Sequence, residues 1–370
     1  MSTRDRLAAL RRGLQRTEPR VDAVLVSEDQ NRRYVSGFTG SAGQLLVTAD
    51  AALLLTDFRY VEQSAWQAPD FEVVKTEGFP WPAVAEQAKR LGVRRLGFES
   101  EHLTVDQHTR LTAALRETAP DVALAPLTGC VEESRQVKDA EEIERLRTAV
   151  LIADRAMEAV TRRLRPGMTE KAIAWELEVE MRQHGAEALS FPIIVASGPN
   201  GAMPHHRPSD RAVREGETIT IDMGCKVGGY CSDLTRTVVL GEPDATFWGV
   251  YDTVLRAQQT CEGRLRAGMT GKAGDALARD VIAAAGHGEH FGHGTGHGVG
   301  LAIHEQPRLT YTAAGEATVP EGAVVTVEPG IYVPGWGGVR IEDMVVVGKD
   351  RCHVLTTAHK APIIKMGEDS

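Results

Sequence analysis

The segment ETITIDMGCKVGGYCSDLTRTV, residues 217–238, contains two apolar runs, Thr218–Met223 and Asp233–Leu240, on either side of a Gly-Gly pair. Alternating β-branched residues that flank a glycine-rich turn predict a hairpin of two strands. Each strand carries one aspartate, Asp222 or Asp233. A buried aspartate is costly unless something pairs with it, and two on facing strands repel each other. The pattern therefore predicts either solvated aspartates at a turn or edge, or a hard cation held between two carboxylates.

The second half of the chain contains an internal repeat around this hairpin. In both copies a threonine, Thr169 or Thr270, stands where it caps the start of a helix. In the register of the repeat, Glu328 corresponds to the first aspartate and Glu342 falls near the second. Two such units folded about a pseudo-two-fold axis bring four carboxylates together. The repeat pairs Leu164–Ala172 with Leu265–Ala273 and Val213–Gly216 with Val319–Gly322.

Four buried carboxylates cannot all ionise side by side without compensation, and two divalent ions would neutralise them. A carboxylate that bridges two metals suits the hydrolysis of amides or phosphoesters. A histidine ligand is available in the run FGHGTGHGVGLAIHE, where His293, His297 and His304 alternate with glycines. So many glycines disfavour a helix, so this run is not the helical HExxH zinc motif. Two further histidines, His205 and His206, precede the first acidic strand.

The first part of the chain predicts a separate α/β domain with a mixed sheet, because helical and strand patterns alternate along it. A polar linker over residues 128–138 follows, and Asp139 with Glu142 then forms a capping box that opens a long amphipathic helix. We therefore predict an N-terminal domain over residues 1–130 and a C-terminal domain over residues 131–370. The first domain is expected to contain helices at 1–20, 81–91 and 105–119, and strands at 23–26, 44–48, 51–56, 95–98 and 122–126.

Composition limits the classes of partner. Of 370 residues, 42% are hydrophobic and 25% charged, as in ordinary globular proteins, and the net charge is −9. This negative charge argues against nucleic acid or an anionic membrane as the main partner. The sequence has no apolar run of membrane-spanning length and no secretory signal pattern. Its five scattered cysteines show no CxxC spacing, so we expect free thiols and a cytoplasmic location.

Taken together, these residues resemble the creatinase/prolidase family of dinuclear metallopeptidases, whose pita-bread fold is shared with methionine aminopeptidase. The N-terminal half resembles the creatinase-type domain of Xaa-Pro peptidases through YVSGFTGSAG and TDFRY, and RQVKDAEEIERLRTA resembles their inter-domain segment. The family's metal ligands are Asp, Asp, His, Glu and Glu in chain order. The matching contexts here are IDMG, SDLTRT, GHGVG, VEPG and VRIED, which assign the ligands to Asp222, Asp233, His297, Glu328 and Glu342.

The resemblance also implies roles for other residues. The catalytic histidines of these peptidases correspond to His205 and His304, although a second histidine directly follows the first of these. His293 and Arg340 correspond to further active-site residues, which we expect to bind substrate. Glu328 is the expected proton shuttle between a hydroxide that bridges the two metals and the leaving nitrogen.

The implied function is hydrolysis of the bond between an N-terminal residue and a following proline. The enzyme would be an Xaa-Pro dipeptidase (prolidase) or an Xaa-Pro aminopeptidase, and the sequence leaves these two alternatives open. The implied cofactors are two divalent ions, with Mn²⁺ favoured by a carboxylate-rich donor set and Zn²⁺ or Co²⁺ as alternatives. The implied substrates are short proline-containing peptides, and the implied assembly is a homodimer.

Three other functions are available to this fold. A methionine aminopeptidase shares the five ligands, but it resembles only the second half of this chain. Creatine hydrolysis on the same fold works without metal, so an intact set of ligands argues against it. A non-catalytic peptide-binding module would have lost the ligands and the histidines, which are all present here.

Overall fold

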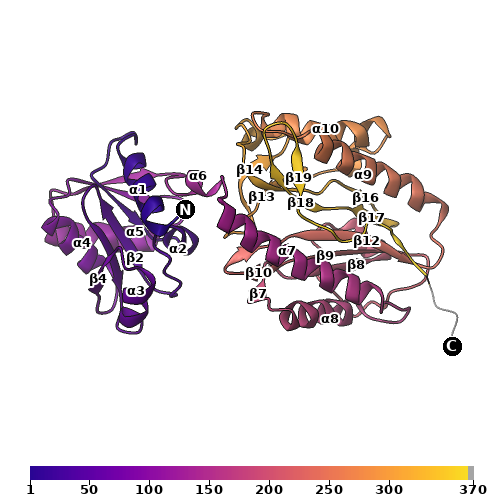
Figure 1. Ribbon diagram of the computed structural model, residues 1–370, viewed down its shortest axis with the longest axis horizontal. Coiled ribbons are helices and arrows are strands. Elements are labelled where there is room, and N and C mark those ends of the chain that lie inside the picture. The colour runs from indigo at the N-terminus through magenta and orange to yellow at the C-terminus, as the bar shows by residue number, and fades with distance from the viewer. Residues whose placement is uncertain (366–370) are drawn as a thin grey trace. The chain divides into compact units, whose positions relative to one another are not determined.

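A computed structural model describes residues 1–365 of the chain (Figure 1). The chain divides into two compact units, Met1–Arg135 and a second that begins at Gln136. Within the described residues, no helix combines the length and the apolar character needed to cross a membrane.

The first unit is built on a six-stranded sheet with the order β4-β3-β2-β1-β5-β6. The pairs β1–β2 and β2–β3 are antiparallel and the other three are parallel, which confirms the predicted mixed sheet. The elements are α1 (Thr3–Leu14), β1 (Ala23–Val26), α2 (Asp29–Ser36), β2 (Gln44–Thr48), β3 (Ala52–Thr56), α3 (Val61–Gln67), β4 (Glu72–Lys75), α4 (Trp81–Arg90), β5 (Arg95–Glu99), α5 (Val105–Thr118), β6 (Ala123–Leu127) and α6 (Glu132–Arg135).

Every strand and helix predicted for this unit is present, but the helix predicted for residues 1–20 ends at Leu14, and α2, α3, β4 and α6 were not predicted. Helix α2 gives no apolar periodicity because it buries polar side chains such as Asn31 and Arg32 together with Tyr34 and Val35. The guanidinium of Arg32 donates to the carbonyl oxygens of Gly40 and Gly43. Polar burial of this kind depends on partners elsewhere in the chain, so the local pattern does not reveal it.

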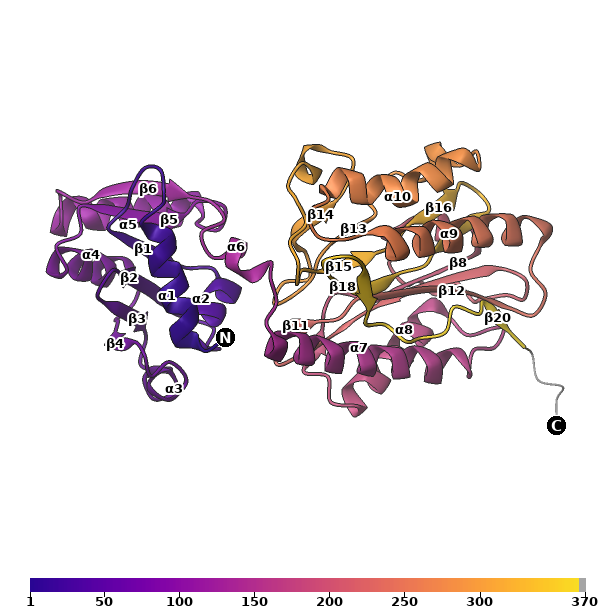
Figure 2. The same ribbon diagram turned by 45° about the horizontal axis from the view of Figure 1, so that its top comes forward.

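The second unit consists of two similar halves, each with a pair of helices packed on a sheet. Figures 1 and 2 show α7 and α8 on one side of the strands and α9 and α10 on the other. The first half contains α7 (Ala140–Thr161), α8 (Glu170–Gln183), β7 (Ala188–Leu189), β8 (Ile194–Ser197), the 3₁₀ helix η1 (Gly198–Ala202), β9 (Thr218–Met223), β10 (Cys225–Val227), β11 (Tyr230–Cys231) and β12 (Leu234–Leu240).

The second half repeats this plan. The central order β12-β9-β8 in one sheet matches β18-β15-β13 in the other, which agrees with the repeat inferred from the sequence. The elements are α9 (Ala245–Arg264), α10 (Gly271–Ala284), η2 (Gly288–His290), β13 (Gly296–Gly298), β14 (Glu305–Leu309), η3 (Ala313–Gly315), β15 (Val324–Val327), β16 (Gly330–Val333), β17 (Gly337–Arg340), β18 (Asp343–Val347), β19 (Cys352–Val354) and β20 (Ile363–Ile364).

The predicted helix caps are confirmed. Thr169 Oγ1 accepts a hydrogen bond from the backbone N–H of Ala172, and Thr270 Oγ1 accepts one from Ala273, each at 3.1 Å. Asp139 caps α7, and the carboxylate of the third helical residue bonds back to the Asp139 N–H. Side-chain caps of this kind satisfy backbone donors that a helix leaves unpaired at its start.

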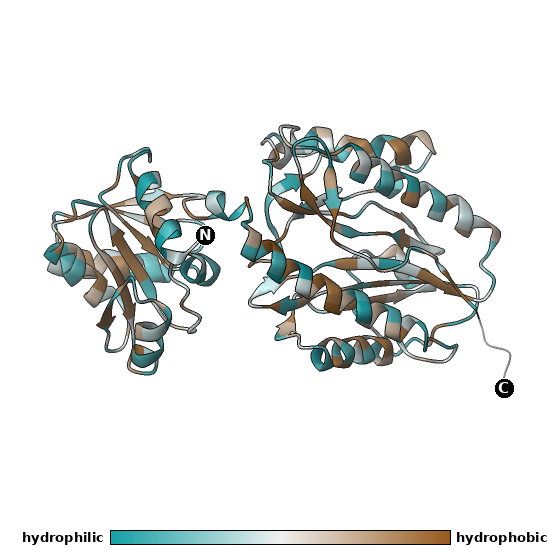
Figure 3. Ribbon diagram, in the orientation of Figure 1, coloured by the Kyte–Doolittle hydropathy of each residue, from teal (hydrophilic) through white to brown (hydrophobic). Residues whose placement is uncertain are grey.

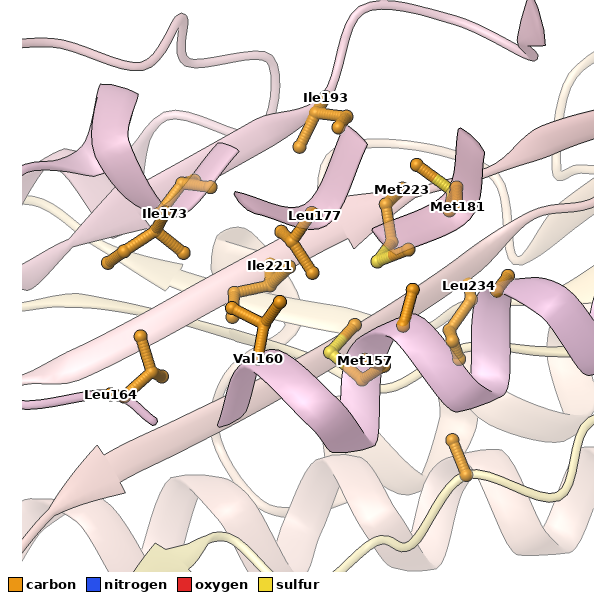
Figure 4. Packing of buried hydrophobic residues seen from close by; sticks show 14 of the residues in the cluster. Met157, Val160, Leu164, Ile173, Leu177, Met181, Ile193, Ile221, Met223 and Leu234 are labelled. Atoms are coloured by element: carbon orange, nitrogen blue, oxygen red, sulfur yellow. The ribbon is translucent and has the colours of Figure 1, made fainter. Parts of the chain in front are cut away.

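Each half has its own apolar core. Figure 4 shows side chains of α7 and α8, among them Met157, Val160 and Leu177, packed over Ile221 and Met223 of β9. In Figure 3 the sheet strands are mostly hydrophobic, whereas the helices combine hydrophobic and hydrophilic residues, as expected of helices with one apolar face. Burial of these faces holds each helix pair to its sheet, and the ends of the sheet strands are left to carry polar groups.

The predicted hairpin is present, but it contains more than two strands. Strands β9 and β12 pair antiparallel, with Asp222 opposite Thr235. Between them the chain leaves this sheet, and β10 and β11 form a small ribbon that pairs with β7. The bend occurs at Gly224, where a Cβ atom would lie 1.9 Å from the carbonyl oxygen of Ser232. The simple two-stranded prediction was therefore incomplete.

The glycine-rich histidine run is not helical, as expected, and its centre forms a short strand that was not predicted. Strand β13 contains only Gly296, His297 and Gly298, and it runs between β14 and β15. A Cβ atom at Gly296 would lie 2.0 Å from the carbonyl oxygen of Thr326, and one at Gly298 would lie 2.2 Å from that of Gln306. Glycine on both sides of His297 is therefore what allows this strand to pass so close to its neighbours.

A third glycine explains how α10 meets the second sheet. Gly271 is the first residue of α10, and a Cβ atom there would lie 1.9 Å from the carbonyl oxygen of Arg308 in β14. Gly263, near the end of α9, has no atom within 4 Å of the corresponding Cβ position. Position 271 therefore requires glycine for steric reasons, whereas position 263 has room for a side chain.

We expect Gly271→Ala to lower the midpoint of thermal unfolding, because overpacking of this kind costs roughly 1–3 kcal/mol. Gly263→Ala is the matched control and should raise the midpoint, because alanine in an open helical position is favoured by roughly 0.5–1 kcal/mol. Differential scanning calorimetry of both variants checks this pair, and shifts of the same sign would contradict the contact between α10 and β14.

Candidate metal centre and active site

All of the residues to which the sequence analysis assigned a metal-binding, catalytic or substrate-binding role line one cavity of about 500 Å³ in the second unit. The acids lie in or next to the central strands of the two halves, and the cavity lies where those strands meet. The residues that line it include His205, Asp222, Asp233, His293, His297, His304, Glu328, Arg340 and Glu342.

The tightest group in this cavity combines acids from both halves with one histidine. One donor atom each from Asp233, His297 and Glu342 lies within 4.8 Å of the others, and all three side chains are buried. His297 Nε2 lies 3.6 Å from Asp233 Oδ2 and 3.3 Å from Glu328 Oε1. This spacing places one nitrogen and several carboxylate oxygens around a single point.

The ring of His297 is oriented by the backbone. Its Nδ1 lies 3.1 Å from the carbonyl oxygen of Gly298, so Nδ1 carries the proton and donates it to that oxygen. Nε2 then faces the acids: it donates to Glu328 when it is protonated, and it would offer its lone pair to a metal ion that displaced this proton. This tautomer is the one that a metal-binding histidine adopts when a neighbour holds its second nitrogen.

The acids differ in their electrostatics. Burial raises the pKa of Asp222, Asp233 and Glu342, and the negative charge of neighbouring carboxylates raises it further. Burial alone would also raise the pKa of Glu328, but a hydrogen bond with His297 and nearby positive charge lower it to about 2. Glu328 is therefore ionised at neutral pH, whereas the pKa values of the other three stay raised, that of Asp222 in spite of its ion pair with Arg340.

This donor set fits divalent cations. Asp222 Oδ1 is buried and accepts no hydrogen bond from any residue in 1–365, although Oδ2 of the same carboxylate is bonded. A buried carboxylate oxygen without a partner is costly, and a bound cation would satisfy it. Carboxylate oxygens with one imidazole nitrogen suit Mn²⁺, Zn²⁺ or Co²⁺, and the cations would also offset the repulsion among the acids.

Two threonines that the sequence analysis did not single out hold the acids in place. Thr235 Oγ1 donates to Glu342 Oε2 at 2.6 Å, and Thr326 Oγ1 donates to Glu328 Oε1 at 3.0 Å. Thr235 follows Asp233 by two positions and Thr326 precedes Glu328 by two. A polar residue two positions from an expected ligand shares its face of a strand, so this spacing was an available signal.

Tyr332 was also missed, and it links Arg340 to His293. Arg340 Nη2 donates to Asp222 Oδ2 at 2.7 Å, and its Nη1 donates to the Tyr332 hydroxyl at 2.9 Å. The hydroxyl proton is then directed at His293 Nε2, 2.8 Å away, while His293 Nδ1 donates to Gly294 O. Both ring nitrogens of His293 are thus bonded within the protein, so the polar binding of substrate expected of it stays a prediction.

The remaining histidines face different surroundings. His205 lines the cavity, whereas the neighbouring His206 turns away from it and bonds to Glu170 Oε2 at 2.8 Å. His304 lies edge-on to His297, with 4.4 Å between the ring centroids. Desolvation of the His304 ring, followed by the charge of His297, lowers the pKa of His304 to about 4, so this ring is neutral at neutral pH.

Arg308 is a further cavity residue that the sequence analysis missed. It lies in β14 opposite His297, is half-buried, and lines the cavity wall. Its guanidinium makes no hydrogen bond or ion pair with residues 1–365. An isolated arginine gives little signal in a sequence, because only the fold shows that its side chain faces a site without forming an ion pair.

Comparison with known proteins agrees with this geometry. Residues 144–349 match metallopeptidase family M24, and residues 6–137 match the creatinase/prolidase N-terminal domain. The uncharacterized peptidase YqhT of Bacillus subtilis strain 168 is 42% identical over 344 residues, which cover 93% of this chain and 96% of the relative.

Solved structures give the same result. An Xaa-Pro dipeptidase from Bacillus anthracis matches with a TM-score of 0.94 and 41% identity, covering 99% of this chain and 100% of that one. An X-Pro aminopeptidase from Thermotoga maritima MSB8 matches with a TM-score of 0.86 and 38% identity, covering 94% of this chain and 98% of that one.

These matches confirm the family and the fold expected from the sequence, namely an α/β chain with a creatinase-type N-terminal domain and a pita-bread C-terminal domain. The chain is a metallopeptidase and belongs to family M24.

Proposed function

We propose that this metallopeptidase is an Xaa-Pro dipeptidase, which hydrolyses dipeptides whose second residue is proline. Similar proteins named Xaa-Pro dipeptidase and X-Pro aminopeptidase support activity before proline. The observation that favours the dipeptide over longer substrates is the guanidinium of Arg308 in the cavity wall.

A half-buried cation without an anion is costly, so a cavity that contains one favours an anionic ligand group. Burial lowers the pKa of Arg308, but an arginine stays charged at neutral pH. In a dipeptide the free α-carboxylate is one residue beyond the scissile bond, and a guanidinium binds it with two parallel hydrogen bonds. A longer peptide presents a neutral amide at that position and leaves Arg308 without an ion-pair partner, with only the attraction of Glu328 to offset its burial.

The assigned residues support peptide hydrolysis. Two divalent ions held by the five expected ligands would polarise the scissile carbonyl and make water a stronger nucleophile at neutral pH. Ionised Glu328 can accept a proton from the attacking water and pass it to the proline nitrogen, which has no proton of its own. Neutral His304 can donate a hydrogen bond to the developing oxyanion, and His205 lines the same cavity.

The proposal extends to the setting of the enzyme. Mn²⁺ is the first candidate for the two ions, because most of the donors are hard carboxylate oxygens. All five cysteines are free thiols, which suits a reducing cytoplasm. Family resemblance supports a homodimer.

The first experiment measures hydrolysis of Ala-Pro, Ala-Pro-Ala and Ala-Ala by metal-stripped enzyme, alone and after addition of Mn²⁺, Zn²⁺ or Co²⁺. We expect cleavage of Ala-Pro only, and only with added metal. Cleavage of Ala-Pro-Ala at a comparable rate would replace the dipeptidase with an aminopeptidase. A lack of cleavage of both proline peptides with every metal would overturn the proposal.

Variants of the site residues test their roles. Glu328→Ala should abolish turnover of Ala-Pro, and His205→Ala and His304→Ala should each lower kcat by roughly 10²–10⁴-fold, as is typical for acid–base or oxyanion groups. His184→Ala, at the end of α8 and outside the cavity, is the matched control and should leave kcat unchanged. Near-wild-type turnover in either cavity variant would remove that histidine from the mechanism.

Arg308→Ala should raise KM for Ala-Pro by roughly 10- to 100-fold, since a hydrogen bond to a charged group contributes about 1.5–3 kcal/mol. The inhibition constant of the amide Ala-Pro-NH₂ against Ala-Pro hydrolysis should change little, because the amide has no carboxylate to lose. Arg207→Ala is the control, because Arg207 also lines the cavity but is exposed to solvent. Equal losses for the acid and the amide would disprove carboxylate recognition by Arg308.

A further inference from the structure

We propose that Glu170 is a positioning residue that holds His205 at the active site. Glu170 is the first residue of α8, and its side chain is fully buried. It does not line the cavity, so it has no direct route to substrate. The part of the inference that concerns turnover rests on the proposed peptidase function, and the structural part does not.

The carboxylate of Glu170 is the centre of a dense set of hydrogen bonds. Its Oε1 accepts from the N–H and the hydroxyl of Ser197, both at 2.8 Å, and from Asn200 Nδ2 at 2.9 Å. Its Oε2 accepts from the N–H of Ser209 at 2.9 Å, from the Ser209 hydroxyl at 2.7 Å and from His206 Nε2 at 2.8 Å. Both oxygens are thus fully used within the protein.

These donors lie on one segment of the chain. Ser197 ends β8, Ser209 precedes β9, and the residues between them form η1 and an irregular loop that carries His205. Such a loop has no sheet ladder of its own to fix its shape. Because both ends of the segment and a residue next to His205 bond to the same carboxylate, Glu170 fixes the path of the loop from inside.

The adjacent residues His205 and His206 have different surroundings. Since a carboxylate only accepts, His206 donates its Nε2 proton to Glu170, and only 12% of its side chain is exposed. This bond orients His206 away from the cavity that His205 lines. Burial alone would raise the pKa of Glu170, but hydrogen bonds from Ser209, Asn200, Ser197 and His206 lower it to about 2, so the anchor is ionised at neutral pH.

The internal repeat shows that the first half contains this carboxylate and that the second half has no equivalent of it. The residue that corresponds to Glu170 in the second half is Gly271, where β14 lies directly against the start of α10. In that half the backbone of β14, which follows His304, packs directly against Gly271, and no side chain fits between this strand and the start of α10. In the first half Glu170 occupies the space between helix and loop, so His205 and His304 are supported in different ways.

The test uses Glu170→Gln, which keeps the size of the side chain but removes its charge and half of its acceptor capacity. We expect kcat for Ala-Pro to fall by roughly 10- to 100-fold, with no further loss when the same change is made in the His205→Ala background. Glu176→Gln, an ion-paired acid on the outer face of α8, is the matched control and should behave as wild type. Independent, multiplying losses from Glu170→Gln and His205→Ala would overturn the proposal.

A second measurement does not depend on turnover. Hydrogen exchange of amides in residues 198–211 should be faster in Glu170→Gln than in wild type, while exchange in residues 294–304 stays the same. Ser209→Ala, which removes one donor and leaves the carboxylate, should give a smaller change of the same kind even if Glu170→Gln does not fold. Unchanged exchange in 198–211 would overturn the proposal, whereas an enzyme inactive on all the peptides would count only against the proposed function.

Discussion

The mutual repulsion of buried carboxylates is the constraint on which the second unit depends. Asp222, Asp233 and Glu342 have raised pKa values because burial and neighbouring negative charge disfavour their ionised forms. A cluster of this kind needs positive charge nearby and a frame that keeps the acids from moving apart. Arg340 supplies part of the charge through its hydrogen bond to Asp222, and divalent cations that fit the donor set would supply the rest.

The frame is provided by bonds between the two halves. The N–H of Glu342, in the second half, donates to the carbonyl oxygen of Thr235 in the first at 3.1 Å. Buried Arg236 donates to the carbonyl oxygen of Glu342 at 2.6 Å and to the carboxylate of Asp343 at 2.7 Å. The acids therefore stand on backbone that is tied across the centre of the unit, which limits how far they can relax from one another.

Duplication explains the acids, and departures from the duplication explain the rest of the site. Each half places two acids in or next to its paired central strands, with Asp222 and Glu328 at corresponding positions and Asp233 two positions before the counterpart of Glu342. The histidine expected to bind metal lies in β13 of the second half, where flanking glycines let His297 pass between two strands. The loop with His205 comes only from the first half, where Glu170 holds it. A symmetrical frame thus carries an asymmetrical set of polar groups, as a reaction with a distinct nucleophile and leaving group requires.

The amino-acid sequence by itself determined the local features. Apolar periodicity, side-chain caps such as Asp139 and the spacing of the repeat depend on neighbouring residues, so they can be inferred from the sequence alone. The acids were found because they occur in repeated, otherwise apolar segments. The tertiary structure alone decided that Arg308 lacks a partner and that Glu170 accepts bonds from a loop some 30 positions later. These features depend on which distant groups the fold brings within hydrogen-bonding range, and this cannot be inferred from the spacing of residues along the chain.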